Sequence, residues 1–244
     1  MMQTENIPGG YDEETSRFEL DYWENFGGTD VFDLHFEAYS KCFPILSLDF
    51  ERENILDIGS GAVSVFEKTA PAKAGITPYD LLADDYNRIA PNKKFPIQNR
   101  ISQQARFSLI TLFNMIDHVV DPVEILEFAD HHLEKKGQLW LAVHLYQPHG
   151  PKGHPQNFSC SSIVGLVSTH FRIDRCAVIR ESVPIPYLWV AELSKREKQQ
   201  SSLVLAWFKY KAYLRYFRFQ SVRALVKAIK LAGLRPLLPK TWQF

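Results

Sequence analysis

The stretch Asn54-Ile-Leu-Asp-Ile-Gly-Ser-Gly61 decides the fold of this chain. An apolar run that contains one acid, Asp57, leads directly into two closely spaced glycines, Gly59 and Gly61. This pattern is typical of a buried strand that turns sharply at its end, because glycine tolerates positive φ and close backbone approach. The turn could hold a dinucleotide, hold another nucleotide-like cofactor, or only connect a strand to a helix, and the three readings imply different proteins.

Around this turn the chain alternates short apolar runs with helix-like segments. We predict strands over 54–58, 75–79, 107–113 and 138–145, helical segments over 84–90 and 123–133 and from 63 to about 70, and a turn over 134–137. A helix capped by Ser159 precedes two further strands, 171–179 and 187–193, which are close enough to pair antiparallel. The pattern predicts an α/β fold, a Rossmann-like doubly wound sheet with helices on both faces and an antiparallel edge.

Bulk composition excludes several classes of protein. The 244 residues are 45% apolar and 23% charged with a formal net charge of zero, which argues against a general nucleic-acid binder. Three widely spaced cysteines give neither a disulfide framework nor a zinc site and fit a reducing cytoplasm. The N-terminus does not read as a signal peptide, and no apolar run approaches the length of about 18 residues that a membrane span needs.

The chain divides into three predicted parts. Residues 1–50 form a helical N-terminal flank or lid, residues 51–195 form the main domain, and residues 196–244 form a basic, aromatic, helical C-terminal extension. The extension has three candidate uses: covering the core, forming a homodimer, or lying on an anionic membrane or glycolipid surface.

Asp57 helps to choose among the readings of the glycine turn. In a dinucleotide site the turn faces a pyrophosphate, and a carboxylate two residues before Gly59 would add negative charge beside negative charge. The same carboxylate suits a ligand that brings positive charge, such as the ammonium and sulfonium of S-adenosylmethionine. Gly59, Ser60 and Gly61 would then let the backbone approach this cofactor while Asp57 holds its ammonium directly or through water.

Two further positions support a nucleoside-type cofactor. Asp80, with Leu81 beside it, ends the second predicted strand 19 residues after Gly61, where a carboxylate can accept both ribose hydroxyls. A helix cap is the alternative role for Asp80, and Asp84 or Asp85 compete for the ribose. Ligands of open α/β sheets bind beyond the carboxyl ends of the strands. The side chains that follow the strand 107–113 should therefore line the cofactor and acceptor cleft: Asn114, Met115, Asp117 and His118.

At this point the chain resembles a known family. NILDIGSG, the acid at Asp80, LITLFNMIDHVVDP and HHLEKKGQLWLAVH together look like the class I S-adenosylmethionine-dependent methyltransferases, of the type 11 kind, over roughly residues 50–195. The resemblance implies a seven-stranded sheet whose last strand is antiparallel. YDLLADDYNRI and HGPKGHPQNF further resemble methyltransferases of bacterial surface-polysaccharide and lipopolysaccharide biosynthesis. Val63 departs from the family, which usually has a third glycine in the turn.

The chemistry of methyl transfer determines which groups the acceptor-binding site must contain. The reaction is an in-line displacement that depends on alignment and on exclusion of water, and a hydroxyl acceptor also needs a base. His118 or His154 could serve as that base, with Asp117 orienting or replacing it. Asn157 and Phe158, in the loop after the strand 138–145, would contact the acceptor. No metal is predicted, because the spacing of His144, His149 and His154 lacks helical geometry and no carboxylate lies among them.

The function predicted from the sequence is O-methylation of a sugar or glycan intermediate with S-adenosylmethionine, in the cytoplasm or peripherally at the inner face of the membrane. One alternative is a methyltransferase of a small lipophilic metabolite such as a quinone. Another is a methyltransferase-like scaffold subunit that has lost catalysis. An apolar acceptor cleft would favour the lipophilic metabolite, whereas a cleft lined by His154, Asn157 and charged groups would favour a sugar.

Overall fold

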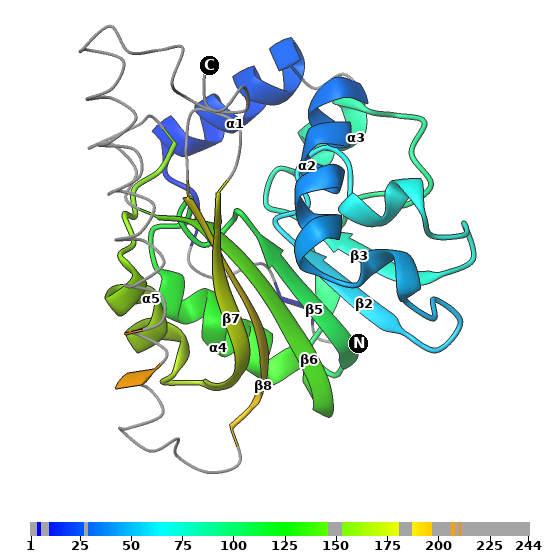
Figure 1. Cartoon of the computed structure of the whole chain (residues 1–244). Helices are drawn as coiled ribbons and strands as arrows, with labels where there is room; N and C mark the ends of the chain where they lie inside the picture. Colours follow the sequence, from blue (N-terminus) through cyan, green and yellow to red (C-terminus); the bar gives the residue numbers. More distant parts are fainter. Residues whose placement is uncertain are drawn as a thin grey trace, which may run out of the picture.

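The computed structural model describes residues 4–5, 10–26, 29–145, 153–180, 187–196, 206–207 and 210. Its centre is a six-stranded sheet in the order β3-β2-β5-β6-β8-β7 (Figure 1). The strands are β2 (Asn54–Ile58), β3 (Gly75–Tyr79), β5 (Phe107–Phe113), β6 (Leu133–His144), β7 (Phe171–Arg180) and β8 (Tyr187–Lys195). A second sheet pairs the short strands β1 (Thr4–Glu5) and β4 (Ile101–Ser102) antiparallel.

Strand direction follows the prediction. The four strands β3, β2, β5 and β6 run parallel, whereas β8 pairs antiparallel with both β6 and β7. The predicted α/β fold with a Rossmann-like parallel sheet and an antiparallel edge is therefore confirmed. Because β2 lies between β3 and β5, the carboxyl ends of these three strands meet at one edge of the sheet.

A seventh strand next to β3 is reduced to a single bridge in the described part of the chain. Gln98 pairs in parallel with Tyr79, and its backbone exchanges hydrogen bonds of 2.9 Å with Asp80 and Pro78. Pro96, two residues earlier, has no N–H to donate to a ladder. The ladder does not extend beyond this point, and the described sheet has six strands where the resemblance implied seven.

Helices cover both faces of the sheet (Figure 1). On one face, α4 (Pro122–His132) and α5 (Cys160–Val167) contribute to a core with Ile110 and Leu112 of β5. On the other face, α2 (Thr29–Cys42) packs Phe36 and Tyr39 into a core with Leu109 and Phe113. Alternate residues of β5 thus enter opposite cores, which explains why the whole strand reads as apolar.

Two local predictions differ from the structure. The helix predicted from residue 63 to about 70 is only the 3-10 turn η2 (Val65–Lys68). The turn predicted over 134–137 lies within β6, as an irregularity between the pairs Phe107–Leu133 and Leu109–Gln138. Gly137 permits this, because an added Cβ would lie 2.9 Å from the carbonyl oxygen of Ser108.

The two ends of the chain differ in how much of them is described. The N-terminal flank contains α1 (Glu13–Phe26) and α2, with a short 3-10 turn η1 (Ile45–Ser47) after them, and α3 (Ala83–Ile89) follows β3. Apart from residues 196, 206–207 and 210, the predicted C-terminal extension lies outside the described residues. Among the described residues no helix is long and apolar enough to cross a membrane.

Candidate active site

The glycine turn follows β2 at the edge where the carboxyl ends of β2, β3 and β5 meet. Gly59 and Gly61 have φ angles of 71° and 62°, a region that favours glycine. The Gly59 N–H donates to the carbonyl of Tyr79 over 2.8 Å, which ties the turn to the end of β3. Ser60 is half-buried, and its hydroxyl contacts the carbonyl of Gly61 at 3.3 Å.

Asp57 is buried beneath this turn, with 2% of its surface exposed. Its Oδ2 accepts from the Ser64 hydroxyl and its Oδ1 from the Thr111 hydroxyl, both over 2.6 Å. Burial raises the pKa of Asp57, and these two hydrogen bonds oppose the rise. Neither partner was predicted from the sequence, although Thr111, a polar residue within an otherwise apolar strand, was a signal that could have revealed one.

Asp80 connects the glycine turn to β3. Its Oδ2 accepts from the Gly61 N–H over 3.2 Å, and its Oδ1 accepts from the Leu82 N–H over 3.0 Å. Burial and then the nearby Glu19 carboxylate raise the pKa of Asp80 to about 7, while the two N–H donors act to lower it. The N-cap position of α3 belongs to Leu82, so Asp80 is not the capping residue that the alternative reading proposed.

The competing acids of α3 have different environments. Asp84 is exposed in the first turn of α3, and Asp85 forms an ion pair of 2.5 Å with Arg88. Leu81, the neighbour of Asp80, is half-buried and packs against the large hydrophobic core. Among these acids, Asp80 is the one that contacts the glycine turn.

Asn114 and Met115 follow β5 beside the same turn. Asn114 has a φ of 53°, unusual for a residue other than glycine, and its N–H donates to Ala142 over 2.8 Å. Its side-chain Oδ1 is buried and has no hydrogen-bond partner in the described part of the chain. Met115 is buried, and a Cβ added at Gly59 would clash with its side chain. Met115 therefore packs directly on the glycine turn.

Helix α1 covers this region, which the sequence predicted only as a flank or lid. The indole ring of Trp23 occupies the space where a Cβ of Gly61 would lie. Glu19 of the same helix contacts the Tyr86 hydroxyl at 3.5 Å, and Phe18 packs against Gly153. The sequence offers no signal for these contacts, because they join residues that are far apart along the chain.

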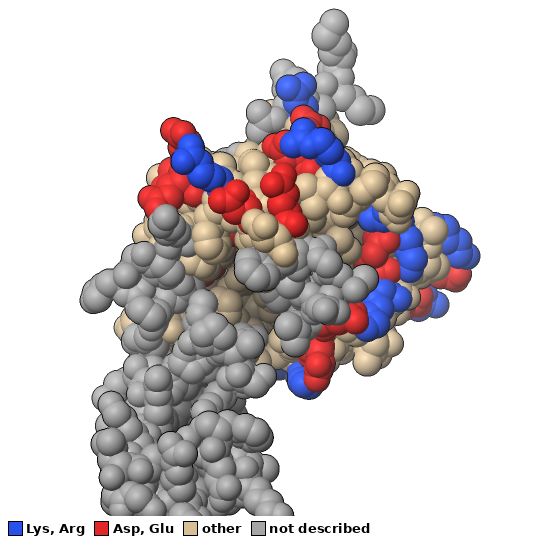
Figure 2. Space-filling view, turned by 90° about the horizontal axis from the view of Figure 1, so that it is seen from above, with Lys and Arg blue, Asp and Glu red and all other residues tan. Residues whose placement is uncertain are grey.

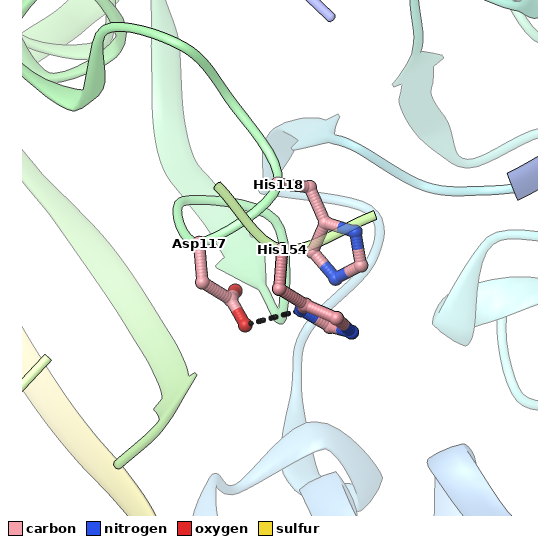
Figure 3. Close-up of side chains that lie close together, drawn as sticks. All are labelled: Asp117, His118 and His154. Atoms are coloured by element: carbon pink, nitrogen blue, oxygen red, sulfur yellow. Dashed lines mark hydrogen bonds and ion pairs between the residues drawn. The ribbon is translucent and has the colours of Figure 1, made fainter. Parts of the chain in front are cut away.

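Asp117, His118 and His154 lie close together in the structure (Figure 3). The ring of His154 donates from Nδ1 to Asp117 Oδ2 over 3.1 Å, and the centroids of the two imidazole rings are 4.0 Å apart. Glu19, which the sequence did not identify, lies with Oε1 2.8 Å from His118 Nδ1. This contact is an ion pair when His118 is protonated, and it does not meet the geometry of a regular hydrogen bond.

Burial strengthens the electrostatic interactions in this cluster. All four side chains are at most 14% exposed. Burial alone would raise the pKa of Asp117, but His118 and the hydrogen bond from His154 lower it. Burial alone would likewise lower the pKa of His118, but the carboxylates of Asp117 and Glu19 raise it. The carboxylates thus favour the charged form of His118, and an imidazolium there would favour the ionised form of Asp117.

The two predicted acceptor residues have different environments. Asn157 is exposed, whereas Phe158 is buried in the core with Ile163 and Val164 and forms a parallel bridge with Leu145. Phe158 therefore contributes to the core under α5, which differs from its predicted role as a wall of the acceptor site. An aromatic ring that does lie beside His154 is Phe18, at 5.9 Å between ring centroids.

The surface at the α1 end of the molecule carries charges of both signs. Figure 2 shows acidic and basic side chains intermixed over the described part of this face. Ion pairs of α1 and α2 include Arg17 with Glu13, Lys41 with Glu37 and Lys68 with Asp33. Residues 1–53 contain thirteen acidic and three basic residues, and these ion pairs partly balance that excess.

Comparisons with known proteins show the family to which the chain belongs. Residues 30–237 match a protein family described as a methyltransferase domain. No curated protein matches the chain.

Solved structures share the fold at low sequence identity. N-methyltransferase NodS from Bradyrhizobium japonicum, in complex with S-adenosylhomocysteine, is 14% identical with a TM-score of 0.57, over 76% of this chain and 100% of that one. The 1,6-didemethyltoxoflavin-N1-methyltransferase of Burkholderia thailandensis is also 14% identical, with a TM-score of 0.56 over 80% and 95% of the two chains. A possible histamine N-methyltransferase from Thermotoga maritima is 13% identical, with a TM-score of 0.53 over 74% and 99%.

The matched region covers most of the chain and includes the glycine turn, Asp80, Asp117, His118 and His154. The chain therefore belongs to the methyltransferase-domain family and is a class I S-adenosylmethionine-dependent methyltransferase.

Proposed function

We propose that this enzyme methylates a hydroxyl oxygen of a sugar or glycan intermediate, with His154 as the general base and Asp117 as the residue that positions it. The observation that carries the proposal is the 3.1 Å hydrogen bond from His154 Nδ1 to Asp117 Oδ2. Such a bond fixes the neutral ring with its proton on Nδ1, so that Nε2 has a lone pair for the acceptor proton.

The cofactor residues of the proposal are those around the glycine turn. Each oxygen of Asp80 accepts one backbone N–H and keeps a second lone pair, which suits two ribose hydroxyls. The buried Oδ1 of Asn114 suits an ammonium donor. Asp57 contributes negative charge beneath the turn, and Gly59, Ser60, Gly61, Leu81 and Met115 complete the set. When bound, S-adenosylmethionine supplies an electrophilic methyl group on its sulfonium.

Proton removal is the step that these side chains would perform. As the acceptor oxygen attacks, its proton passes to His154 Nε2, and the ring becomes an imidazolium. Asp117, buried and hydrogen-bonded to the same ring, stabilises that charge. Helix α1 covers the region through Trp23 and Phe18, which would exclude water from the reacting groups.

The polarity of the cluster favours a sugar over a lipophilic acceptor. Glu19, Asp117, His118 and His154 offer several hydrogen-bonding groups within a small volume, as a polyhydroxylated molecule requires. The Phe18 ring beside His154 favours the second candidate, a planar lipophilic metabolite, because it provides an apolar contact at the same place.

Kinetics of histidine variants test the base. We expect His154→Ala or His118→Ala to lower the turnover of methyl transfer, by about 100-fold or more if the base itself is removed, while cofactor affinity in calorimetry stays nearly unchanged. The matched control is His131→Ala, an exposed histidine whose Nε2 lies 3.0 Å from the Gln103 carbonyl oxygen. If neither cluster variant slows methyl transfer, the catalytic assignment is wrong.

The acceptor class needs a different measurement. Mass spectrometry of surface glycans from cells with and without the gene should reveal one methyl group that depends on the enzyme. A glycan profile that stays the same, together with loss of a methylated lipophilic metabolite, would replace the sugar by the second candidate.

A further inference from the structure

We propose that His118 and His154, supported by Glu19 and Asp117, form a binding site for one divalent transition-metal ion of the Zn²⁺ type. No metal is predicted from the sequence, because histidines 144, 149 and 154 lack helical spacing and have no carboxylate among them. His149 lies outside the described residues, and the structure instead brings His154 together with Asp117 and His118, with Glu19 of α1 beside His118.

Geometry supplies the first argument. Asp117, His118 and His154 each offer one ligand atom, and these atoms all lie within 4.8 Å of one another. Bonds from zinc to nitrogen or carboxylate oxygen are about 2.0 to 2.2 Å long, so ligand atoms of one site are separated by up to about twice that length. A small contraction would bring the two imidazole nitrogens to coordination distance, while Asp117 stays hydrogen-bonded to His154 Nδ1.

The arrangement of carboxylates supplies the second argument. A histidine that binds metal through one ring nitrogen usually has its other nitrogen next to a carboxylate or carbonyl. Both histidines meet this condition at Nδ1, His154 beside Asp117 and His118 beside Glu19. His118 is buried, and its Nε2 has no hydrogen-bond partner in the described part of the chain. That nitrogen is the atom best suited to receive an ion.

Charge supplies the third argument. Glu19 and Asp117 bring two carboxylates into a region where their side chains are 14% and 1% exposed. Buried charges are stable when they are paired or when they coordinate a metal. Protonated histidines can compensate for these carboxylates, and one divalent ion bound to two neutral histidines compensates for them equally well. The nitrogen and oxygen donors favour zinc or a neighbouring transition metal over Mg²⁺ or Ca²⁺, which prefer oxygen alone.

Metal binding and the proposed catalysis would compete for one group. The lone pair of His154 Nε2 cannot both bind an ion and accept the acceptor proton. Bound Zn²⁺ should therefore inhibit methyl transfer, and a chelator should restore it. This consequence rests on the proposed function, whereas metal binding itself does not.

Zinc binding by the full-length, tag-free protein tests the site independently of activity. After treatment with a chelator, the chain is titrated with ZnCl₂ in competition with a chromophoric chelator. We expect one ion per chain, and an affinity about 10- to 100-fold weaker in Glu19→Gln, where a residue that supports a ligand is changed. His118→Gln should lose the site, whereas the matched control His131→Ala should keep it. Circular dichroism of each variant checks that it is folded.

Two results would overturn the metal site. One is wild-type protein that binds no Zn²⁺ in competition with the chelator. The other is folded His118→Gln and His154→Gln proteins that bind it as tightly as the wild type, which would indicate adventitious surface sites only. Failure of the proposed function is recognised differently, by unchanged methyl transfer in His154→Ala whatever the zinc affinity.

Discussion

The carboxylate of Asp80 accepts a hydrogen bond of 3.2 Å from the backbone N–H of Gly61. This bond joins the glycine turn after β2 to the end of β3, 19 residues farther along the chain. It holds two parts of the proposed cofactor site in contact, which reduces the ordering that cofactor binding requires.

Cofactor affinity should depend on both buried acids. We expect Asp80→Ala to weaken S-adenosylmethionine binding by about tenfold or more, because it removes a charge-assisted hydrogen-bond acceptor. Asp57→Ala should also weaken binding, because the hydroxyls of Ser64 and Thr111 lose their common partner under the turn. Isothermal calorimetry measures both. Wild-type affinity in the two variants would contradict the cofactor assignment.

Asp80 should also make stability depend on pH. Its pKa is raised from an ordinary value of 3.8 to about 7, so between these values the folded chain holds a proton that the unfolded chain has released. Stability therefore falls as pH rises through this window, by at most about 1.4 kcal/mol per pH unit from this group. Urea unfolding of wild type and Asp80→Asn measures the contribution. A stability difference between the two that stays constant across the window would exclude it.

Gly61→Ala should destabilise the protein. The substitution puts a Cβ on a residue with a φ of 62° and against the ring of Trp23. The backbone conformation alone costs about 1 to 2 kcal/mol, and the steric overlap adds to it. The control is Gly165→Ala within α5, where a Cβ would meet nothing within 4 Å. Higher helix propensity should stabilise that variant by about 0.5 to 1 kcal/mol, and thermal unfolding compares the two directly.

Thr111→Val should reveal the importance of the hydrogen bond to Asp57. Valine keeps the shape of threonine but removes the donor, which leaves one oxygen of a buried carboxylate without this partner. We expect a loss of about 1 to 3 kcal/mol in the free energy of unfolding. Thr69→Val is the matched control, because the Thr69 hydroxyl oxygen is buried with no hydrogen-bond partner in the described part of the chain. Equal effects of the two substitutions would argue against a special role for Thr111.

Asp117→Asn should show whether Asp117 positions His154 for catalysis or contributes to binding of the acceptor and cofactor. The amide cannot stabilise an imidazolium as the carboxylate does, and it permits the other ring tautomer of His154. We expect kcat to fall by about 100-fold or more, with acceptor KM and cofactor affinity nearly unchanged. Asp117→Glu should recover part of the activity. A variant that instead loses cofactor affinity would mean that Asp117 acts mainly through the structure of the site.

The sequence by itself determined the fold and predicted the edge of the sheet at which a cofactor would bind. The strands β2, β3 and β5 begin and end where the apolar runs predict, because each is bounded by turn residues and buried on both faces. The acids Asp57 and Asp80 and the glycines between them could be predicted as cofactor residues for the same reason, since parallel strands bring their carboxyl ends together. Ser159 caps α5 as its side chain predicts.

Only the tertiary structure decided which groups meet. His154 joins Asp117, 37 residues away, and Glu19 of α1 joins His118, although periodicity along the chain gives no sign of either pair. Phe158 is predicted from the sequence to contact the acceptor, yet it packs into the core. Local sequence patterns predict secondary structure and burial, whereas contacts between loops depend on how separate helices and strands pack. The hydrogen bond, the ion pair and the pKa shifts among Glu19, Asp117, His118 and His154 therefore depend on the tertiary fold and not on any one segment.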